Sequence, residues 1–579
     1  MSRYSRSMKI PPRISLRTFR RRLASIDSLP QFAILGIASG LVTGLVIIAF
    51  RLMIEWPLTL FLIDDPEKFE QLSRLQAFLL PLGGVLVLLP LFLLISENDR
   101  HVGVVHVLER LSRHQGHMPW KNAVYQFFAG AIALGSGQSG GREGPAIQLG
   151  AAGSSLLGQY LKLPNNSVRV LVGCGAAAAI SASFNTPVAG VIFSMEVIIM
   201  EYTIAGFIPV ILASVVAALL TQTVFGSATA FDVPPVSMAS LIDLPILLVE
   251  GIFVGAVAAV FVRTFFLVHE RRPASISLRL LIAGLLTGSV AVFVPEILGV
   301  GYDTVNLALA GELGVVILLT VFILKTLVSS TILALGIPVG IIGPTLFIGA
   351  MAGSLFALAA KLLDTGLSAD AFYVMLGMGA MMGAVLQAPL AALMAVLELT
   401  NNPNIILPAM LVIIVANMTA SQVFGLKSVF LMHMETLGLE FRQNPLSQAL
   451  NRASVASIMI RNFERVSRSL DIEKARELVR SKYLWLLVDG SSGPSFILRV
   501  EDLNQYLQGE PKEEIDLTEI PATRKDVRGI YLQATLGEAL DMLNQSGVQA
   551  LYVNRISAPL LDSPVGIVTR EDIETFYQG

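Results

Sequence analysis

Two glycine-rich motifs with the composition of anion-binding sites occur in this chain, 199 residues apart. Residues 141–145 read Gly-Arg-Glu-Gly-Pro, and residues 340–344 read Gly-Ile-Ile-Gly-Pro. Proline is favoured in the first turn of a helix, so each motif predicts a helix start. The first amides of a helix have no partner inside it, and the helix dipole places partial positive charge there. Each motif is therefore a candidate anion-binding site.

A second pair of matching interruptions follows the first pair. Residues 185–189 read Asn-Thr-Pro-Val-Ala, and residues 387–391 read Gln-Ala-Pro-Leu-Ala. In both copies a glutamate, Glu196 or Glu398, lies nine residues after the proline. Hydrophobic segments that are interrupted at matching positions indicate a transport site at the interface of two membrane repeats. Because the two motifs are alike, we expect them to share one site.

Glu143 is the only acidic residue in the two glycine-rich motifs. An anion in a low-dielectric membrane needs dipoles in exchange for its hydration shell, and partial charges still allow its release. A carboxylate among these amides can occupy the anion's place when ionised and vacate it when protonated, which predicts a gate. The alternative is that Glu143 only caps its helix. For Glu196 and Glu398, pairing with buried donors is the simpler interpretation, although intramembrane carboxylates are functional candidates.

Composition predicts a polytopic membrane protein. Hydrophobic residues make up 54% of the chain, charged residues 15%, and the mean hydropathy is +0.68, whereas roughly a quarter of residues are charged in soluble domains. Hydrophobic windows that reach the roughly 20 residues needed for a membrane span cover residues 32–54, 77–95, 204–225, 243–268, 314–335 and 405–424. Gly and Pro interrupt other hydrophobic stretches near residues 135–137, 141–145, 161–165, 184–187, 340–344 and 386–389. Since non-helical backbone at membrane depth must be buried or line a cavity, we expect these breaks at the centre of the protein.

The distribution of charge predicts four parts along the chain. The first 22 residues hold eight Lys or Arg and no acid, which predicts a cytoplasmic amino terminus in contact with anionic lipid rather than with nucleic acid. The expected parts are a basic segment at 1–30, a membrane domain at 31–435, a linker at 436–449 and a soluble domain at 450–579. The membrane domain divides into repeats of about 31–225 and 243–435, which lie inverted if each contains an odd number of spans.

The soluble end is a second internal repeat, over residues 454–507 and 526–577. Each copy has a helical pattern (472–479 or 536–543), a β-rich run (483–488 or 548–553), a second short strand and an acidic helix start. The order predicts a small α/β domain. It resembles a tandem pair of CBS modules.

The two glycine-rich motifs, the Phe-Asn-Thr-Pro turn at 184–187 and the CBS-like pair together resemble the CLC family of chloride channels and proton-coupled chloride antiporters. The resemblance covers most of residues 30–579. It implies an all-α inverted-repeat membrane fold with broken helices and a homodimer with one ion pathway per subunit. It also implies cytoplasmic termini, a location in the cell (inner) membrane, and Glu143 as the gate. The implied anion-binding residues are Val102, Gly103, Gly141, Arg142, Glu143, Gly144, Ile341, Ile342 and Phe430.

Three positions depart from the family pattern. A serine of the family's first signature loop is replaced by Val102, and the pore tyrosine by Phe430, so two hydroxyl donors are missing. The anion would rest on backbone amides and apolar contacts, which favours large, easily dehydrated anions over strict chloride preference. The internal proton-transfer glutamate of the family's antiporters is Val197, which cannot relay a proton.

These departures favour a dimeric anion channel in which pH and voltage act through Glu143. The alternative is a proton-coupled anion antiporter on the same fold, because Glu196, Glu201 or a water chain can substitute for Val197. An enzyme is not expected, since the hydrophobic region lacks a paired-aspartate, His-Glu-x-x-His or Ser-His constellation. The six histidines show no metal-ligand spacing, so neither a metal nor a required cofactor is expected.

The CBS-like pair adds one candidate site. The resemblance implies binding of an adenine nucleotide (ATP, ADP or AMP), with Thr569 as the phosphate contact and Asp572 as the ribose contact. The first module has Arg499 and Asp502 at these positions, so only one cleft has the full pattern. The alternative is a pair that serves only dimerisation.

Overall fold

The computed structural model describes most of the chain, with gaps at both termini and in several loops. The expected basic segment 1–30 and linker 436–449 lie mainly outside the described residues. Two compact units are present: Phe32–Leu161 with Val168–Phe441, and Lys162–Ser167 with Arg442–Gly579. The residues described are 23, 29–59, 62, 68–96, 99–202, 204–227, 231, 233, 236–241, 243–362, 368–439, 449–491, 493–509, 512–555 and 564–578.

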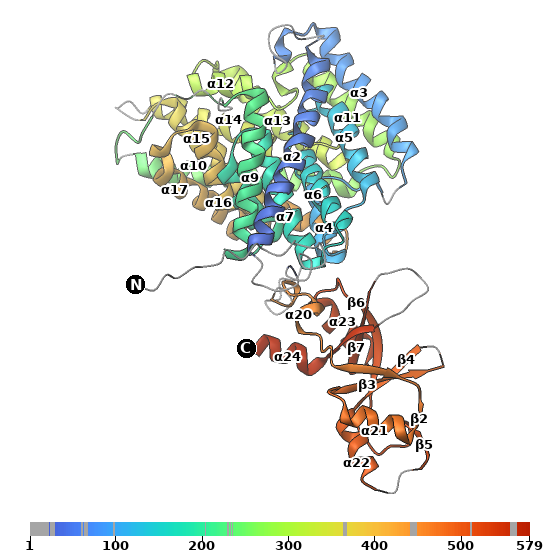
Figure 1. The fold of residues 1–579 in the computed structure, drawn as a ribbon. Coiled ribbons are helices and arrows are strands. Elements are labelled where there is room, and N and C mark those ends of the chain that lie inside the picture. The colour runs from blue at the N-terminus through green and yellow to red at the C-terminus, as the bar shows by residue number, and fades with distance from the viewer. Residues whose placement is uncertain are drawn as a thin grey trace, which may run out of the picture. The chain divides into compact units, whose positions relative to one another are not determined.

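The first unit is helical throughout (Figure 1). Its first repeat contains α2 (Leu29–Leu58), α3 (Arg74–Leu94), α4 (Gly103–Arg113), α5 (Trp120–Gly135), α6 (Glu143–Tyr160), α7 (Asn165–Phe184), α8 (Pro187–Phe193) and α9 (Ile204–Phe225). Its second repeat contains α10 (Asp243–Arg271), α11 (Ile276–Ala291), α12 (Tyr302–Ala310), α13 (Val315–Leu335), α14 (Ile342–Leu362), α15 (Asp370–Leu386), α16 (Pro389–Thr400), α17 (Ile406–Met418) and α18 (Val429–Thr436).

Eight helices of the described chain are long and hydrophobic enough to cross a membrane. All six windows expected from the sequence are among them, and α7 and α14 add two more. The multi-pass membrane fold predicted from composition is therefore confirmed. The two added helices contain several small residues, which dilute the hydrophobic signal of their windows although both are deeply buried.

The interruptions expected from Gly and Pro are real helix boundaries. Helices α6 and α14 begin within the two glycine-rich motifs, and α8 and α16 begin at Pro187 and Pro389. Asn185, which follows α7, and Gln387, which follows α15, both have left-handed backbone, with φ of 59° and 53°. A left-handed residue followed shortly by proline ends one helix and starts another, so the breaks follow from local sequence.

Glycines bring the helices around the breaks into backbone contact. A Cβ at Gly150 would collide with the carbonyl of Gly175, so α6 and α7 cross at these glycines. In the second repeat, a Cβ at Gly349 would collide with the carbonyl of Gly377, where α14 crosses α15. Residues Ala371–Leu386 of α15 are all buried. A helix that is buried on every side lies in the core of a large protein, and here it supports the breaks from behind.

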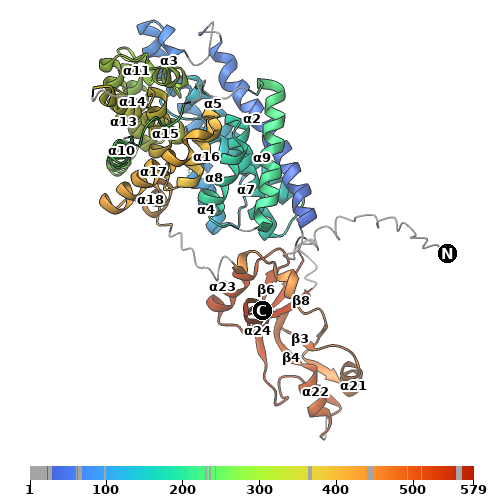
Figure 2. The same cartoon turned by 90° about the vertical axis from the view of Figure 1, so that its left-hand side faces the viewer.

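Helix α2 packs along α9, as both views show (Figures 1 and 2). A Cβ at Gly36 would meet the backbone of Pro209, and one at Gly40 would meet the backbone of Ala213. Small residues four apart allow membrane helices to approach closely. The first and last long helices of the first repeat are thereby joined.

The second unit contains a six-stranded sheet in the order β1-β3-β4-β6-β7-β8 and a two-stranded sheet of β2 and β5. Pairs β1/β3 and β6/β7 are parallel, while β3/β4, β4/β6 and β7/β8 are antiparallel. The elements are α20 (Val455–Ile458), β1 (Phe463–Val466), β2 (Ser469–Asp471), α21 (Ile472–Arg480), β3 (Trp485–Gly490), β4 (Gly493–Arg499), α22 (Val500–Leu507), β5 (Glu514–Asp516), β6 (Lys525–Tyr531), α23 (Leu536–Ser546), β7 (Ala550–Asn554), β8 (Pro564–Thr569) and α24 (Arg570–Gln578).

The strand order shows that this unit is a tandem α/β repeat, as its sequence predicts. Each copy places one parallel and one antiparallel partner beside its central strand, β3 or β7. The central strands are lined by buried residues such as Leu486 and Leu551, which pack in separate cores. The sequence pattern did not identify β1 and β6, because most of their side chains are exposed or half-buried and they lack a continuous hydrophobic run.

Candidate functional site

The two glycine-rich motifs lie side by side in the structure. The amide of Gly141 donates to the carbonyl of Gly340 at 2.9 Å, and the amide of Gly340 donates to the carbonyl of Gly141 at 2.6 Å. This antiparallel bridge joins residues at equivalent positions of the two repeats. Reciprocal bonds between equivalent residues are the mark of a local twofold axis. The two motifs thus form one site, as their similarity predicts.

Both helices that start at this bridge present amides without helical partners. The first backbone bond inside α6 runs from Ala146 to Arg142 at 3.0 Å, and the first inside α14 runs from Thr345 to Ile341 at 3.1 Å. The amides before these donors lie at helix N-termini, where the dipole is positive. Two such N-termini from opposite repeats therefore converge on the bridge, which is the arrangement an anion site requires.

The carboxylate of Glu143 lies at this convergence and is fully buried. Its nearest backbone donors are the amides of Glu143 itself and of Gly343, at the starts of α6 and α14, although neither oxygen forms a well-aligned hydrogen bond with the described residues. The oxygens lie against three glycines: a Cβ at Gly340 would be 2.7 Å from Oε2, a Cβ at Gly343 would be 2.9 Å from Oε1, and a Cβ at Gly141 would overlap the carboxylate. A helix cap needs amides of its own helix only, whereas this carboxylate faces amides at the starts of both α6 and α14, as an anion at this position would.

A cavity of about 140 Å³ lies on one side of Glu143. A water molecule needs roughly 10–15 Å³ of such volume, so the cavity has room for several waters or a partly hydrated anion. Phe265, Leu333 and His433 contribute to its largely apolar wall. Six residues that the sequence predicts as anion-binding line it: Val102, Gly103, Gly144, Ile341, Ile342 and Phe430.

A smaller cavity of about 20 Å³ lies on the other side, with room for about one water. Glu143 lines this cavity, its neighbour Gly144 lines the larger one, and Ile342 lines both. Phe184 and Thr186 from the first repeat and Ala391 from the second complete much of its wall. A carboxylate between a larger and a smaller cavity has the position of a gate.

Arg142 and Gly141 line neither cavity. The guanidinium of Arg142 lies over the rings of Phe184 at 5.2 Å and Tyr302 at 5.8 Å, and its Nη1 is 3.7 Å from Glu55 Oε1. The side chain is therefore directed toward aromatic rings and away from the larger cavity. Gly141 contributes its backbone to the bridge.

Gly103 lines the larger cavity, but its amide is already engaged. It donates to Gln148 Oε1 on α6, and Gln148 Nε2 donates in turn to Asn122 Oδ1 on α5. Val102, the residue before α4, provides no side-chain cap, which is consistent with its apolar side chain. Sequence reasoning missed Gln148 and Asn122. The sequence signal for both is a polar residue inside a hydrophobic helix, and the structure shows that both side chains are fully buried.

Val197 is buried in the short π-helix Ser194–Ile199 and lines neither cavity. Its neighbour Glu196 accepts hydrogen bonds from the amides of Leu390 at 3.3 Å and Ala391 at 2.7 Å, at the start of α16. The geometry is consistent with the structural interpretation of Glu196.

Glu398 makes the same contact in the opposite direction. Its carboxylate accepts hydrogen bonds from the amides of Val188 at 2.9 Å and Ala189 at 2.7 Å, at the start of α8. Each repeat therefore supplies the carboxylate that caps the broken helix of the other repeat. The sequence analysis expected these two glutamates to pair with buried donors, and in the structure the donors are the backbone amides at the starts of α8 and α16.

The predicted nucleotide contacts in the α/β unit bond to each other. Thr569 donates to Asp572 Oδ2 from its amide at 2.8 Å and from its hydroxyl at 2.7 Å, and the amide of Asp572 donates back to the hydroxyl at 3.3 Å. These reciprocal bonds form a capping box at the start of α24. In the first copy, Arg499 lies over the ring of Trp485 at 5.4 Å instead.

Comparison with known proteins gives a consistent family. Residues 83–421 match the sequence model of the family described as Voltage gated chloride channel. The H(+)/Cl(-) exchange transporters ClcA of Salmonella arizonae and Salmonella schwarzengrund are each 29% identical over 420 residues, which cover 70% of this chain and 89% of theirs.

Solved structures share the fold at lower identity. A slow cyanobacterial Cl-/H+ antiporter has a TM-score of 0.60 at 22% identity, covering 73% of this chain and 99% of its own. A CLC-type fluoride/proton antiporter has a TM-score of 0.60 at 20% identity, covering 70% and 97%. A eukaryotic CLC transporter has a TM-score of 0.57 at 16% identity and covers 95% of this chain and 99% of its own. The last match extends over the C-terminal unit as well.

Proposed function

The chain belongs to the voltage gated chloride channel family, and from this premise we propose that it exchanges an anion for protons across a membrane. The observation that carries the proposal is the buried carboxylate of Glu143 at the meeting point of two helix N-termini. The relatives named as H(+)/Cl(-) exchange transporters match over 89% of their length, which supports exchange over passive conduction. The antiporter, the alternative in the sequence analysis, is thus better supported than the channel.

In the proposed mechanism, Glu143 and the anion compete for the same amides. The ionised carboxylate takes the place of the anion where α6 and α14 begin, because both are stabilised by the same dipoles. Protonation removes the charge that these dipoles favour, so the side chain leaves and an anion from the larger cavity takes its place. The anion therefore occupies the site only while Glu143 is protonated, and Glu143 returns only after the anion has left. In each cycle we expect the anion and the proton to move in opposite directions.

The anion is held by dipoles and apolar contacts rather than by side-chain hydroxyls. Val102 and Phe430 line the larger cavity where hydroxyl groups would otherwise contact the anion. Apolar walls do not compensate for the loss of hydration, so anions that dehydrate easily enter at lower cost. We therefore propose chloride or a larger monovalent anion as the substrate.

A gated anion channel is the second candidate, and Val197 favours it. Valine cannot carry a proton, and Glu196 beside it is held by two amides of α16. With no protonatable group at this position, protons would reach Glu143 only from one side. The anion would then flow down its gradient without proton movement.

Paired flux measurements in reconstituted vesicles distinguish the two candidates. For an antiporter, an imposed chloride gradient drives protons uphill, and a pH gradient shifts the reversal potential of the anion current. For a channel, the reversal potential follows the anion gradient alone and no uphill proton movement occurs. The Glu143→Gln protein is the control, because its gate cannot ionise and the antiporter should lose proton movement in this variant.

We further propose, on the resemblance to the family, that the protein is a homodimer in the cell (inner) membrane with both termini in the cytoplasm. The tandem α/β repeat is proposed to be a CBS pair that binds an adenine nucleotide at Thr569 and Asp572. Nucleotide would have to compete with the hydrogen bonds that now join these two side chains. Calorimetric titration with ATP, repeated on Asp572→Asn, tests this assignment.

A further inference from the structure

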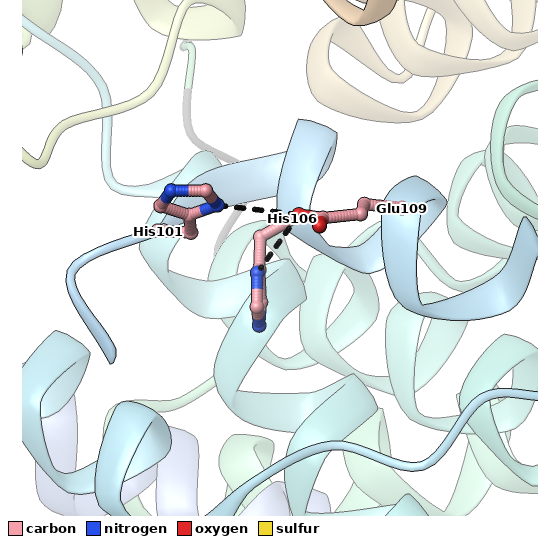
Figure 3. Close-up of side chains that lie close together, drawn as sticks. All are labelled: His101, His106 and Glu109. Atoms are coloured by element: carbon pink, nitrogen blue, oxygen red, sulfur yellow. Dashed lines mark hydrogen bonds and ion pairs between the residues drawn. The ribbon is translucent and has the colours of Figure 1, made fainter. Parts of the chain in front are cut away.

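Three potential metal ligands lie together at the start of α4 (Figure 3). His101 precedes the helix, and His106 and Glu109 lie three residues apart on it. Their ligand atoms all lie within 4.8 Å of one another. Figure 3 shows a ring nitrogen of each histidine directed toward the carboxylate of Glu109. The linear spacing of the histidines gave no metal-ligand signal, because the third ligand is a glutamate and the first lies outside the helix.

The separations fit the edges of a tetrahedral metal site. Nδ1 of His101 is 3.3 Å from Glu109 Oε2, and Nδ1 of His106 is 3.6 Å from the same oxygen. Zinc binds imidazole nitrogen at about 2.0–2.1 Å and carboxylate oxygen at about 2.0–2.2 Å, which places tetrahedral ligand atoms about 3.4 Å apart. A metal ion can therefore reach both histidines and the glutamate after only small side-chain movements.

In the part of the chain that the structure describes, the buried member of the cluster, His106, contacts only the other two cluster members through its ring, apart from apolar packing. The side chain of His106 is 3% exposed, Nδ1 has Glu109 Oε2 at 3.6 Å as its nearest partner, and Nε2 forms no hydrogen bond with the described residues. Buried polar atoms are normally paired, and each one without a partner calls for an explanation such as an ion. The side chain of His101 is 50% exposed, so an ion can enter the site from its side.

We propose that His101, His106 and Glu109 bind a divalent transition metal ion such as Zn²⁺. Two imidazoles and one carboxylate suit zinc and its neighbours in the first transition row better than Mg²⁺ or Ca²⁺, which prefer oxygen ligands. Three protein ligands leave the fourth position of a tetrahedral ion for water or an anion. The site does not depend on the proposed antiport, because its geometry belongs to α4 and the residues before it.

The surroundings hold the cluster beside the larger cavity. Asn122 donates to the backbone carbonyls of Asp99 and His101 and so fixes the segment before α4. The next residue, Val102, lines the cavity. A bound cation would add positive charge next to the space in which we expect the anion.

Metal titration of the full-length protein tests the site, after removal of any polyhistidine tag. We expect one equivalent of Zn²⁺ to bind in competition with a chromogenic chelator, and Co²⁺ to give the intense visible absorption of tetrahedral coordination. His101→Ala removes an exposed side chain whose ring contacts Glu109 and His106, and it should weaken binding about tenfold or more. Glu109→Gln should weaken it further, because the anionic ligand is lost.

A matched control and two opposing outcomes complete the test. His117→Ala removes a half-buried histidine of the same region, whose Nδ1 lies 3.2 Å from the carbonyl of His114, and it should leave binding unchanged. Absence of stoichiometric Zn²⁺ binding by the wild-type protein would overturn the proposal. So would wild-type affinity in both His101→Ala and Glu109→Gln. Size-exclusion profiles identical to wild type establish that the variants are folded.

Discussion

The two membrane repeats build the same backbone around different side chains. Gly141 and Gly340 exchange hydrogen bonds as equivalent residues, and α6 and α14 begin beside them in the same way. Two residues after these glycines, however, the first repeat has Glu143 and the second has Ile342. Backbone symmetry thus provides two sets of amides, and only one of them carries an ionisable group.

A second comparison between the repeats has the opposite result. Glu196 and Glu398 are equivalent, and each caps the broken helix of the other repeat with two hydrogen bonds. A carboxylate that is present in both repeats with equivalent partners has a structural role that explains its presence. A buried carboxylate that is present in one repeat, where the other repeat has Ile342, is not required by the shared architecture and calls for a function. The predictions below test this distinction, beginning with the largest expected effect.

Substitution of the unmatched carboxylate should have the largest effect. Glu143→Gln keeps the size of the side chain but cannot ionise, so it should abolish proton movement and flatten the pH dependence of anion flux. Anion flux at neutral pH should rise, because the side chain no longer competes as an anion. Ile342→Val, a conservative change at the equivalent position, is the control and should retain proton coupling. Unchanged coupling and flux in Glu143→Gln would return Glu143 to a structural role.

The two bridging glycines should differ when alanine replaces them. A Cβ at Gly340 would meet the backbone of Gly144 and Gly141 as well as Glu143 Oε2, whereas the three atoms nearest to a Cβ at Gly141 all belong to the Glu143 carboxylate. Gly340→Ala should therefore lower the thermal midpoint, with an overpacking cost of about 1–3 kcal/mol. Gly141→Ala should displace mainly the flexible carboxylate, so it should change the pH dependence of flux with a smaller loss of stability. Equal midpoints for the two variants, measured by thermal unfolding in detergent, would contradict this difference.

The matched glutamates should behave alike when each is changed to glutamine. Each change weakens two hydrogen bonds to helix amides, and we expect a loss of about 1–2 kcal/mol in stability for either variant. Proton coupling should persist in both, as measured by uphill proton movement in vesicles. Loss of coupling in Glu196→Gln alone would instead identify Glu196 as the proton carrier in place of Val197.

Restoring a hydroxyl at the larger cavity should change selectivity by a smaller factor. Val102→Ser supplies a donor next to Gly103, and one hydrogen bond contributes about 0.5–1.5 kcal/mol. The flux of chloride relative to nitrate or thiocyanate should therefore rise several-fold. Val102→Thr is nearly isosteric with valine and is the matched variant that isolates the hydroxyl. No change in either variant would place the anion away from this residue.

The smallest effect is expected at Glu70, which lies outside the membrane spans and contacts the second repeat at Asp303 and Thr304. Burial, followed by a hydrogen bond with the carboxyl of Asp303, raises the pKa of Glu70 to about 8. A raised pKa contributes stability below the ordinary value of 4.5 that is lost as the pH rises through about 8. The thermal midpoint of the wild type should fall between pH 5 and about 9 more than that of Glu70→Gln. Parallel pH profiles would contradict this.

Local sequence was sufficient to predict the helix boundaries. The breaks at Pro187 and Pro389 lie where they were expected, because proline and left-handed residues act within a few positions of themselves. The long spans were predictable for the same reason, since length and hydrophobicity are local properties. Helices α7 and α14 were harder to recognise, because small residues lower their hydropathy while packing keeps them buried.

The contacts within the site were less predictable. The use of the Gly103 amide by Gln148 and the approach of His101 to Glu109 depend on how a loop and two helices are placed. No periodicity encodes such distances. The sequence was also insufficient to choose between channel and antiporter, because that choice depends on which groups can reach Glu143 as well as on the residue at position 197.

The sequence by itself determined the membrane class, the internal repeats, the position of each break and the presence of one unmatched carboxylate, Glu143. These features follow from composition and from the conformational limits of Gly and Pro, which act locally. Only the tertiary structure decided that Gly141 bonds to Gly340, that each repeat caps the other, and that His101, His106 and Glu109 meet. These contacts join side chains or segments whose approach depends on packing, and packing is a property of the whole fold.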